Sequence, residues 1–237
     1  MAEASLRSPG EGRRIRMAPD DRERMILQEA VRFLAKHGFT AQIREFAAEA
    51  GISQGLIYRY FRSKRELVER VYEHNFLKRW DSTWEDALQD RRHPLEARLT
   101  RFYSSYLKAI DDPDWIRLVM YSGLEGNDLT RRYIRTQVER LLRIIAVECR
   151  DLSALPALSA QPVGEAEIEA VWHLHSTFIY YLVRKHIFGI GPIEDRDMLV
   201  RVAVTDFLRG IGAVLADIGS GSGGRAQKKT NGRWTDE

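Results

Sequence analysis

The chain has 237 residues, of which 44% are apolar and 30% charged, and its net charge is +3. These values are typical of a globular protein with one module of about 50 residues and one larger domain. No apolar run approaches the roughly 20 residues of a membrane span, and the Arg-rich N-terminus lacks the apolar segment of a secretory signal, so no membrane partner is expected. A single cysteine, Cys149, excludes an internal disulfide and favours a reducing, cytoplasmic location.

The positive charge is concentrated in the first third of the chain. Residues 1–80 hold 16 Lys/Arg against 11 Asp/Glu, whereas residues 81–218 hold 17 against 21. Such an excess is typical of a nucleic-acid-binding face, although an ordinary solvated surface also carries it by chance. Residues 1–19, rich in Arg, Gly and Ser, predict a disordered basic arm that either reaches DNA or remains a solvated tail.

Three helices are predicted within residues 20–66. Asp20 or Asp21 can cap the first helix, which Gly38 ends. A shorter helix follows over residues 43–50, with its apolar side chains at helical spacing.

The third predicted helix covers residues 54–61 and follows a tight turn. Gly51 supplies the unusual backbone angle of this turn, and Ser53 caps the helix. Two short helices joined in this way predict a helix-turn-helix, whose second helix can lie in the major groove of DNA.

The side chains of this third helix suit a nucleic-acid contact. Gln54 can pair with adenine, Gly55 lets the backbone approach, and Leu56 can contact a thymine methyl group. Tyr58, Arg59 and Tyr60 carry groups that can bond phosphates. The alternative is a plain helical hairpin in a core. It does not explain why six polar and cationic side chains occur within eight consecutive positions. These side chains are Tyr58, Arg59, Tyr60, Arg62, Lys64 and Arg65.

Ser63 and Glu66 form the pattern of a capping box and predict the start of a long fourth helix. Apolar residues occur on more than one side of this helix, up to Trp80. A connector helix between two domains needs two such faces.

Residues 51–67 read Gly-Ile-Ser-Gln-Gly-Leu-Ile-Tyr-Arg-Tyr-Phe-Arg-Ser-Lys-Arg-Glu-Leu. This segment resembles the signature of the TetR family of transcriptional regulators, and the likeness extends from Arg24 to Val71. The resemblance implies that Arg44, Gln54, Gly55 and Leu56 face bases and that Tyr58 and Lys64 bond phosphates. The stretch 38–47 is one residue shorter than the common family spacing and lacks its capping threonine, so Gln42 or Thr40 is expected to cap the second helix.

The rest of the chain also predicts helices, so the expected fold class is all-α. The predicted ranges are 94–110, 113–123, 127–150, 165–188 and 195–217, with a loop at 152–164 and a disordered tail at 219–237. The resemblance implies that residues 67–218 form a ligand-sensing and dimerisation domain. In it, helices 165–188 and 195–217 pair with their copies in a homodimer, or else they are simply core.

Aromatic and polar side chains on the middle helices are candidates for an effector pocket, although aromatic stripes at helical spacing also occur in cores. The candidates are Phe102, Tyr103, Tyr106, Trp115, Met120, Tyr121, His175 and Tyr181.

No cysteine cluster, histidine pair or phosphate-binding glycine loop occurs, so neither a metal nor a cofactor is expected. The sequence therefore predicts a regulator, not an enzyme: a repressor that binds a double-stranded operator and is released by a small molecule. The alternatives are a DNA-binding regulator without a ligand, and a helical protein or enzyme that does not bind DNA.

Overall fold

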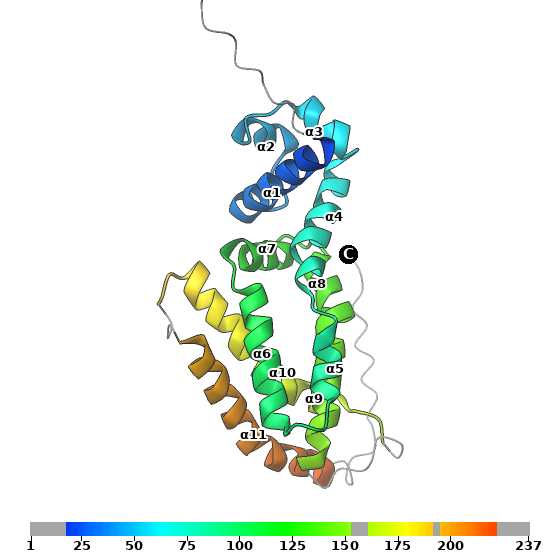
Figure 1. Cartoon of the computed structure of the whole chain (residues 1–237), viewed down its shortest axis with the longest axis vertical. Coiled ribbons are helices and arrows are strands. Elements are labelled where there is room, and N and C mark those ends of the chain that lie inside the picture. Colours follow the sequence, from blue (N-terminus) through cyan, green and yellow to red (C-terminus); the bar gives the residue numbers. More distant parts are fainter. Residues whose placement is uncertain (1–17, 153–160, 192–194, 222–237) are drawn as a thin grey trace, which may run out of the picture.

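The computed structural model describes residues 18–152, 161–191 and 195–221, and within these ranges every regular element is a helix. Four helices form the N-terminal end of the molecule, at the top of Figure 1, and the larger helical body lies below them. The first four helices are α1 (Pro19–His37), α2 (Ile43–Glu49), α3 (Gln54–Tyr60) and α4 (Lys64–Asn75).

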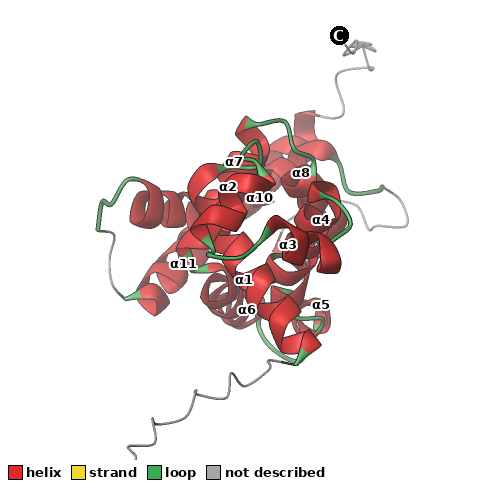
Figure 2. Cartoon of the chain, turned by 90° about the horizontal axis from the view of Figure 1, so that it is seen from above, coloured by secondary structure: helices red, strands yellow, loops and turns green. Residues whose placement is uncertain are grey.

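The body contains the remaining helices, and α4 runs from the N-terminal end toward it (Figure 1). Seen from above, the described residues form helices joined by loops (Figure 2). The longer ones are α6 (Leu95–Ile110), α7 (Pro113–Leu124), α9 (Glu139–Cys149), α10 (Glu165–Leu182) and α11 (Arg196–Gly221). The shorter ones are α5 (Thr83–Gln89) and α8 (Leu129–Tyr133), two 3₁₀ turns at Leu77–Arg79 and Arg150–Leu152, and two π-helical segments at Ile134–Val138 and Val183–Ile187.

Several predicted caps are confirmed. The Ser53 hydroxyl accepts a hydrogen bond from the Leu56 N–H at 3.1 Å, and the Ser63 hydroxyl accepts one from the Glu66 N–H at the same distance. Gly38 ends α1 with φ +80°, in the region that favours glycine. These side chains satisfy backbone groups that a helix end leaves unpaired.

Some helix boundaries differ from the predicted ones. The first helix begins at Pro19, after Ala18, so Asp20 and Asp21 lie in its first turn and do not cap it. Proline has no N–H to satisfy at that position, which allows the earlier start.

The fourth helix is shorter than predicted and ends at Asn75. The chain tightens into the 3₁₀ turn at Leu77–Arg79, which brings the Trp80 ring to 5.2 Å from that of Trp84 and 6.1 Å from that of Tyr133. This aromatic packing outweighs continuation of the helix. The following helix, α5, was not predicted.

At the other end, α11 continues to Gly221, although the glycine–serine composition predicted a tail from residue 219. A final turn costs little because the helix is already nucleated. The rest of the predicted arm and tail (1–17 and 222–237) and residues 153–160 of the predicted loop lie outside the described residues.

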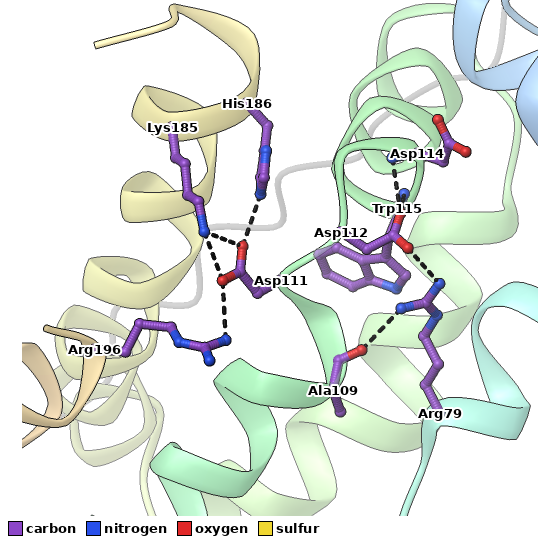
Figure 3. Close-up of polar contacts among 9 residues, drawn as sticks. All are labelled: Arg79, Ala109, Asp111, Asp112, Asp114, Trp115, Lys185, His186 and Arg196. Atoms are coloured by element: carbon purple, nitrogen blue, oxygen red, sulfur yellow. Dashed lines mark hydrogen bonds and ion pairs between the residues drawn. The ribbon is translucent and has the colours of Figure 1, made fainter. Parts of the chain in front are cut away.

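A polar corner between α6 and α7 holds several elements together (Figure 3). The Asp111 carboxylate receives hydrogen bonds from Lys185 at 2.7 Å, from His186 at 2.7 Å and from Arg196 at 3.1 Å. Burial acts to raise the pKa of Asp111, but the hydrogen bonds from Lys185 and His186 outweigh it and leave the pKa lowered. This carboxylate therefore ties the π-helical segment after α10 and the start of α11 to the turn between α6 and α7.

The next residue, Asp112, caps α7 and also binds the segment after α4. Its carboxylate accepts the N–H groups of Asp114 and Trp115 at 2.8 and 2.9 Å and the Arg79 guanidinium at 3.0 Å. Arg79 also donates to the Ala109 carbonyl at 2.9 Å. The corner thus fixes α7 relative to the connection that leads from α4.

Candidate DNA-binding and ligand-binding sites

The turn between α2 and α3 sets the orientation of α3. Gly51 has φ +64°, and the next residue, Ile52, donates its N–H to the Ala47 carbonyl at 3.0 Å. Ile57 and Phe61 are each 1% exposed and anchor α3 to the core. The opposite side of α3 consequently faces solvent.

Four of the predicted DNA-binding residues lie on this outer side of α3, and a fifth, Arg44, lies on α2. Arg44, Gln54, Gly55, Tyr58 and Arg59 are exposed. A Cβ atom added at Gly55 would meet nothing within 4 Å, so no internal contact requires the glycine. This position is therefore free for an external contact.

The other three predicted DNA-binding residues are half-buried. Leu56 and Tyr60 pack partly against the core, while Lys64 is the first residue of α4. Gln42 precedes α2 and donates its backbone N–H to the Glu45 carboxylate at 2.8 Å. Gln42, not Thr40, is therefore the capping position, and Arg44 lies in the first turn of α2.

Cations in the N-terminal helices fall into two groups. Arg24, Arg32, Lys36 and Arg70 each form an ion pair with a carboxylate. In contrast, a second group forms no ion pair with any described residue. This group consists of Arg22 on α1 and of five cations on and around α3, which are called the free cations below: Arg44, Arg59, Arg62, Lys64 and Arg65. Their charge is available to an external anion.

The larger domain contains a partly open cavity of about 530 Å³, within the range of small-molecule sites. The helices α6, α7, α8 and α10 and both π-helical segments contribute to its wall. The lining residues are Tyr106, Trp115, Val119, Met120, Gly123, Leu124, Thr130, Tyr133, Ile134, Val138, Trp172, His175, Ser176, Ile179, Tyr180 and Val183.

Four predicted pocket residues line this cavity: Tyr106, Trp115, Met120 and His175. The other four do not. Phe102, Tyr103 and Tyr181 are at most 2% exposed and belong to the packed core, because α6 and α10 turn these positions away from the cavity. The Tyr121 hydroxyl instead donates to the Lys36 carbonyl at 3.2 Å.

Sequence reasoning missed most of the apolar wall, including Tyr133, Ile134 and Trp172. The π-helical segments at Ile134–Val138 and Val183–Ile187 place Ile134, Val138 and Val183 in this wall. Single π-helical turns are frequent at functional sites, but no sequence pattern used above predicts them.

The polar groups of the cavity wall are held in their uncharged forms. Burial lowers the pKa of His175 to about 4 and raises the pKa of Tyr133 to about 12. Burial, and then the neighbouring Tyr133, raise the pKa of Tyr106 further still. No hydrogen bond of regular geometry joins the Tyr106 hydroxyl to a described residue, although Tyr133 lies close to it.

An apolar contact connects the cavity to α4. Phe76, directly after α4, is fully buried. Its ring centroid lies 5.9 Å from that of Trp115 and 5.5 Å from that of Tyr133, and both partners line the cavity. These three rings are called the aromatic seam below.

A polar contact connects the cavity to the turn between α1 and α2. Glu125, directly after α7, accepts hydrogen bonds from the N–H groups of Phe39 at 2.6 Å and Thr40 at 3.0 Å. A Cβ atom at Gly38 would collide with this carboxylate, so the close approach requires the glycine. Gly123 and Leu124, one turn or less away, line the cavity. This contact is called the Glu125 clamp below.

Neither a metal site nor a membrane-spanning helix occurs in the part of the chain that the structure describes. No group of three His, Cys, Asp or Glu side chains there could hold a metal ion. No helix among those residues is long and apolar enough to cross a membrane.

Comparisons with known proteins agree with this geometry. Residues 26–71 match the family model described as "Bacterial regulatory proteins, tetR family". The HTH-type transcriptional repressor KstR2 of Mycolicibacterium smegmatis is 33% identical over 102 residues, which are 40% of this chain and 49% of that protein. The match thus spans about half the length of this curated relative.

Solved structures share the fold over most of the chain. A TetR-like transcriptional regulator from Rhodococcus sp. RHA1 has a TM-score of 0.61 at 18% identity, covering 82% of this chain and 100% of that one. The fatty acid degradation regulator FadR from Bacillus halodurans has a TM-score of 0.57 at 17% identity, covering 83% and 98%. Residues 26–71, which contain the helix-turn-helix, thus match the tetR family of bacterial regulatory proteins, and the chain shares the all-helical fold of these solved structures over most of its length.

Proposed function

We propose that the chain is a sequence-specific DNA-binding transcriptional regulator, a repressor that a small molecule releases from its operator. The observation that carries this proposal is the group of free cations around the exposed face of α3. Elsewhere in the same four helices most cations are paired with carboxylates. Unpaired cations on and around a groove-sized helix suit the phosphates of a duplex.

The proposed contacts divide into two classes. Gln54, Leu56 and Arg44 read base edges in the major groove, with Gly55 leaving room for the backbone. The contacts to backbone phosphates come from Tyr58, Arg59, Tyr60 and Lys64, which orient the protein without reading sequence. Lys64 begins α4, whose N-terminal dipole adds to its attraction for an anion.

The proposed division is a DNA-binding domain over residues 20–66 and a regulatory and dimerisation domain over residues 67–218. Two apolar side chains on α10 and α11 support a homodimer through these helices, because Tyr180 is 58% exposed and Val202 is 50% exposed. A two-fold dimer places two copies of α3 in successive major grooves, about 34 Å apart. Val202→Arg should shift the sedimentation coefficient to that of a monomer, whereas an unchanged dimer would exclude α11 from the interface.

The proposed control by a small molecule depends on two contacts between the cavity and the N-terminal helices. An occupant that moves α7 changes the Glu125 clamp, and one that moves Trp115 or Tyr133 changes the aromatic seam. Such an occupant releases DNA only if it binds the DNA-free arrangement more tightly than the DNA-bound one.

The proposal is tested by selecting bound sequences from random duplex DNA with the full chain at a stated salt concentration. We expect a two-fold symmetric motif with half-sites about one helical turn apart. Enrichment of no motif, with only weak and salt-sensitive binding, would contradict sequence-specific regulation. A motif without symmetry would contradict the dimer.

A further inference from the structure

The cavity wall contains no Asp, Glu, Lys or Arg among its lining residues. Its buried ionisable side chains are Tyr106, Tyr133 and His175, all with pKa values that keep them uncharged near neutral pH, and a fourth tyrosine of the wall, Tyr180, is 58% exposed. A charged group placed against such a wall loses its hydration without gaining a counter-ion. The wall therefore disfavours a ligand whose charged group is buried in the cavity.

Cations do occur near the cavity, but in a separate groove. Lys36 and Arg117 line this groove, which shares Met120 and Leu124 with the cavity. A ligand with an acidic group would have to reach this groove to find a counter-ion. A polar group held inside the cavity favours binding of the ester over the acid, whereas a polar group held in the groove favours binding of the acid.

Buried polar atoms of the wall have no hydrogen-bond partner among the described residues. They are the His175 Nδ1, the Trp115 indole N–H and the Tyr106 hydroxyl, on side chains that are at most 2% exposed. The rings of His175 and Tyr106 lie side by side, with centroids 5.2 Å apart. A buried donor without an acceptor is destabilising, so the Trp115 N–H, the Tyr106 hydroxyl and His175 in its Nδ1-protonated tautomer suit an occupant that brings acceptor atoms.

From this geometry we propose that the cavity binds an uncharged, mainly apolar molecule with a carbonyl-type acceptor, such as a ketone or ester, and that Tyr106 and His175 bond this acceptor. The proposal names the chemical class of the effector and so rests on the proposed function. Trp115, Trp172 and Tyr133 supply aromatic surface for the apolar part of the molecule. The cavity of about 530 Å³ leaves room for a ligand larger than a solvent molecule.

The test is isothermal titration calorimetry of the full chain, without DNA, with methyl decanoate and with decanoate at pH 7.5. These probes share one alkyl chain and differ in charge. We expect the ester to bind and the carboxylate to bind at least about 10-fold more weakly. Equal or tighter binding of decanoate, or no binding of the ester up to its solubility limit, would overturn the proposal.

Tyr106→Phe and His175→Phe test the acceptor contact, and Tyr103→Phe is the matched control. Tyr103 is also buried on α6 with an unbonded hydroxyl, but it does not line the cavity. We expect the first two variants to weaken ester binding by about 3- to 10-fold and the control to leave it unchanged. Equal effects of Tyr103→Phe and Tyr106→Phe would overturn the assignment, since the loss would then reflect the core.

Gly123→Phe tests the location. A Cβ atom at Gly123 meets no other atom within 4 Å, and the residue lines the cavity, so a phenyl ring there narrows the cavity at an exposed part of its wall without disturbing the fold. We expect ester binding to disappear while thermal stability is retained; undiminished binding in a folded variant would exclude the cavity. Because no DNA is present, these outcomes are independent of the duplex selection that tests the proposed regulator.

Discussion

The exposed face of α3 and the wall of the cavity use opposite chemistry. Around α3 the free cations lie in solvent, where salt screens them. The cavity wall has no charged side chain among its lining residues, and Tyr106, Tyr133 and His175 in it are buried. We therefore expect salt to change DNA binding at α3 and pH to change the unfolding free energy through His175 in the cavity wall.

The two contacts between these regions differ in the same way. The aromatic seam is apolar and buried, whereas the Glu125 clamp joins a half-buried carboxylate to two backbone N–H groups. The seam should contribute chiefly stability, and the clamp should contribute chiefly the orientation of the N-terminal helices. The following predictions separate these contributions.

The largest effect is expected from Phe76→Ala, which removes the centre of the seam. Phe76 is fully buried, so the variant should lose about 3–5 kcal/mol of unfolding free energy, measured by urea denaturation. The control is Phe188→Ala, because the Phe188 side chain is 57% exposed. A loss no greater than that of the control would show that the seam does not join the two regions.

Acid should destabilise the protein through His175. Burial lowers its pKa from the ordinary 6.5 to about 4, so between these pH values the unfolded chain binds a proton that the folded chain does not. The unfolding free energy should thus fall with decreasing pH by about 1.4 kcal/mol per pH unit at most. The total loss should be about 3 kcal/mol near pH 4.

This contribution is isolated by comparing the wild type with His175→Phe over the same pH range. The variant should lose that part of the slope, whereas the exposed His173→Phe should retain it. Parallel curves for the wild type and His175→Phe would be inconsistent with a buried, uncharged histidine in the cavity wall.

On the exposed face of α3, Gln54→Ala should cost roughly 1–3 kcal/mol of binding free energy at one base step of the selected operator. Fluorescence anisotropy with single-base operator variants measures this cost. The control is Gln28→Ala on the exposed surface of α1. An unchanged base preference would remove Gln54 from the residues that read bases.

A smaller effect is expected from Glu125→Gln, which weakens the clamp but keeps an acceptor oxygen. The variant should lose about 1 kcal/mol of unfolding free energy, since the clamp is only partly buried. Glu165→Gln, at an exposed position of α10, serves as the control. A loss as large as that of Phe76→Ala would reverse the ranking of the two contacts.

The smallest effect is expected from Lys64→Ala, which removes one free cation. Binding to all duplexes should weaken about equally, and the slope of log affinity against log salt should fall by about 1. Lys108→Ala, at an exposed position of α6, should leave the slope unchanged. A loss confined to one operator would indicate that Lys64 reads a base.

Sequence reasoning was most accurate where backbone chemistry is local. Gly38, Ser53 and Ser63 mark helix ends because their side chains, or the lack of one, suit only a few backbone geometries. The cavity was harder to predict. Tyr103 and Tyr106 lie one turn apart on α6, and only the packing of α7 and α10 decides that Tyr106 lines the cavity.

Other features depended on contacts between distant parts of the chain. The Glu125 clamp joins Glu125 to Phe39 and Thr40, which lie 86 and 85 positions earlier in the sequence. Nothing in the local sequence of Phe39 or Thr40 indicates this contact. The end of α4 at Asn75 likewise follows from the packing of Trp80 against Trp84 and Tyr133. Helical periodicity alone extended this helix too far.

The central claim is that occupation of the cavity controls DNA binding at α3. The direct measurement is the affinity of the full chain for its selected operator during a titration with methyl decanoate, with calorimetry establishing that the cavity is saturated. We expect the ester to weaken operator binding by a factor of about 5 to 150. Saturating operator should weaken ester binding by the same factor. An operator affinity that stays constant while the cavity is filled would contradict the account.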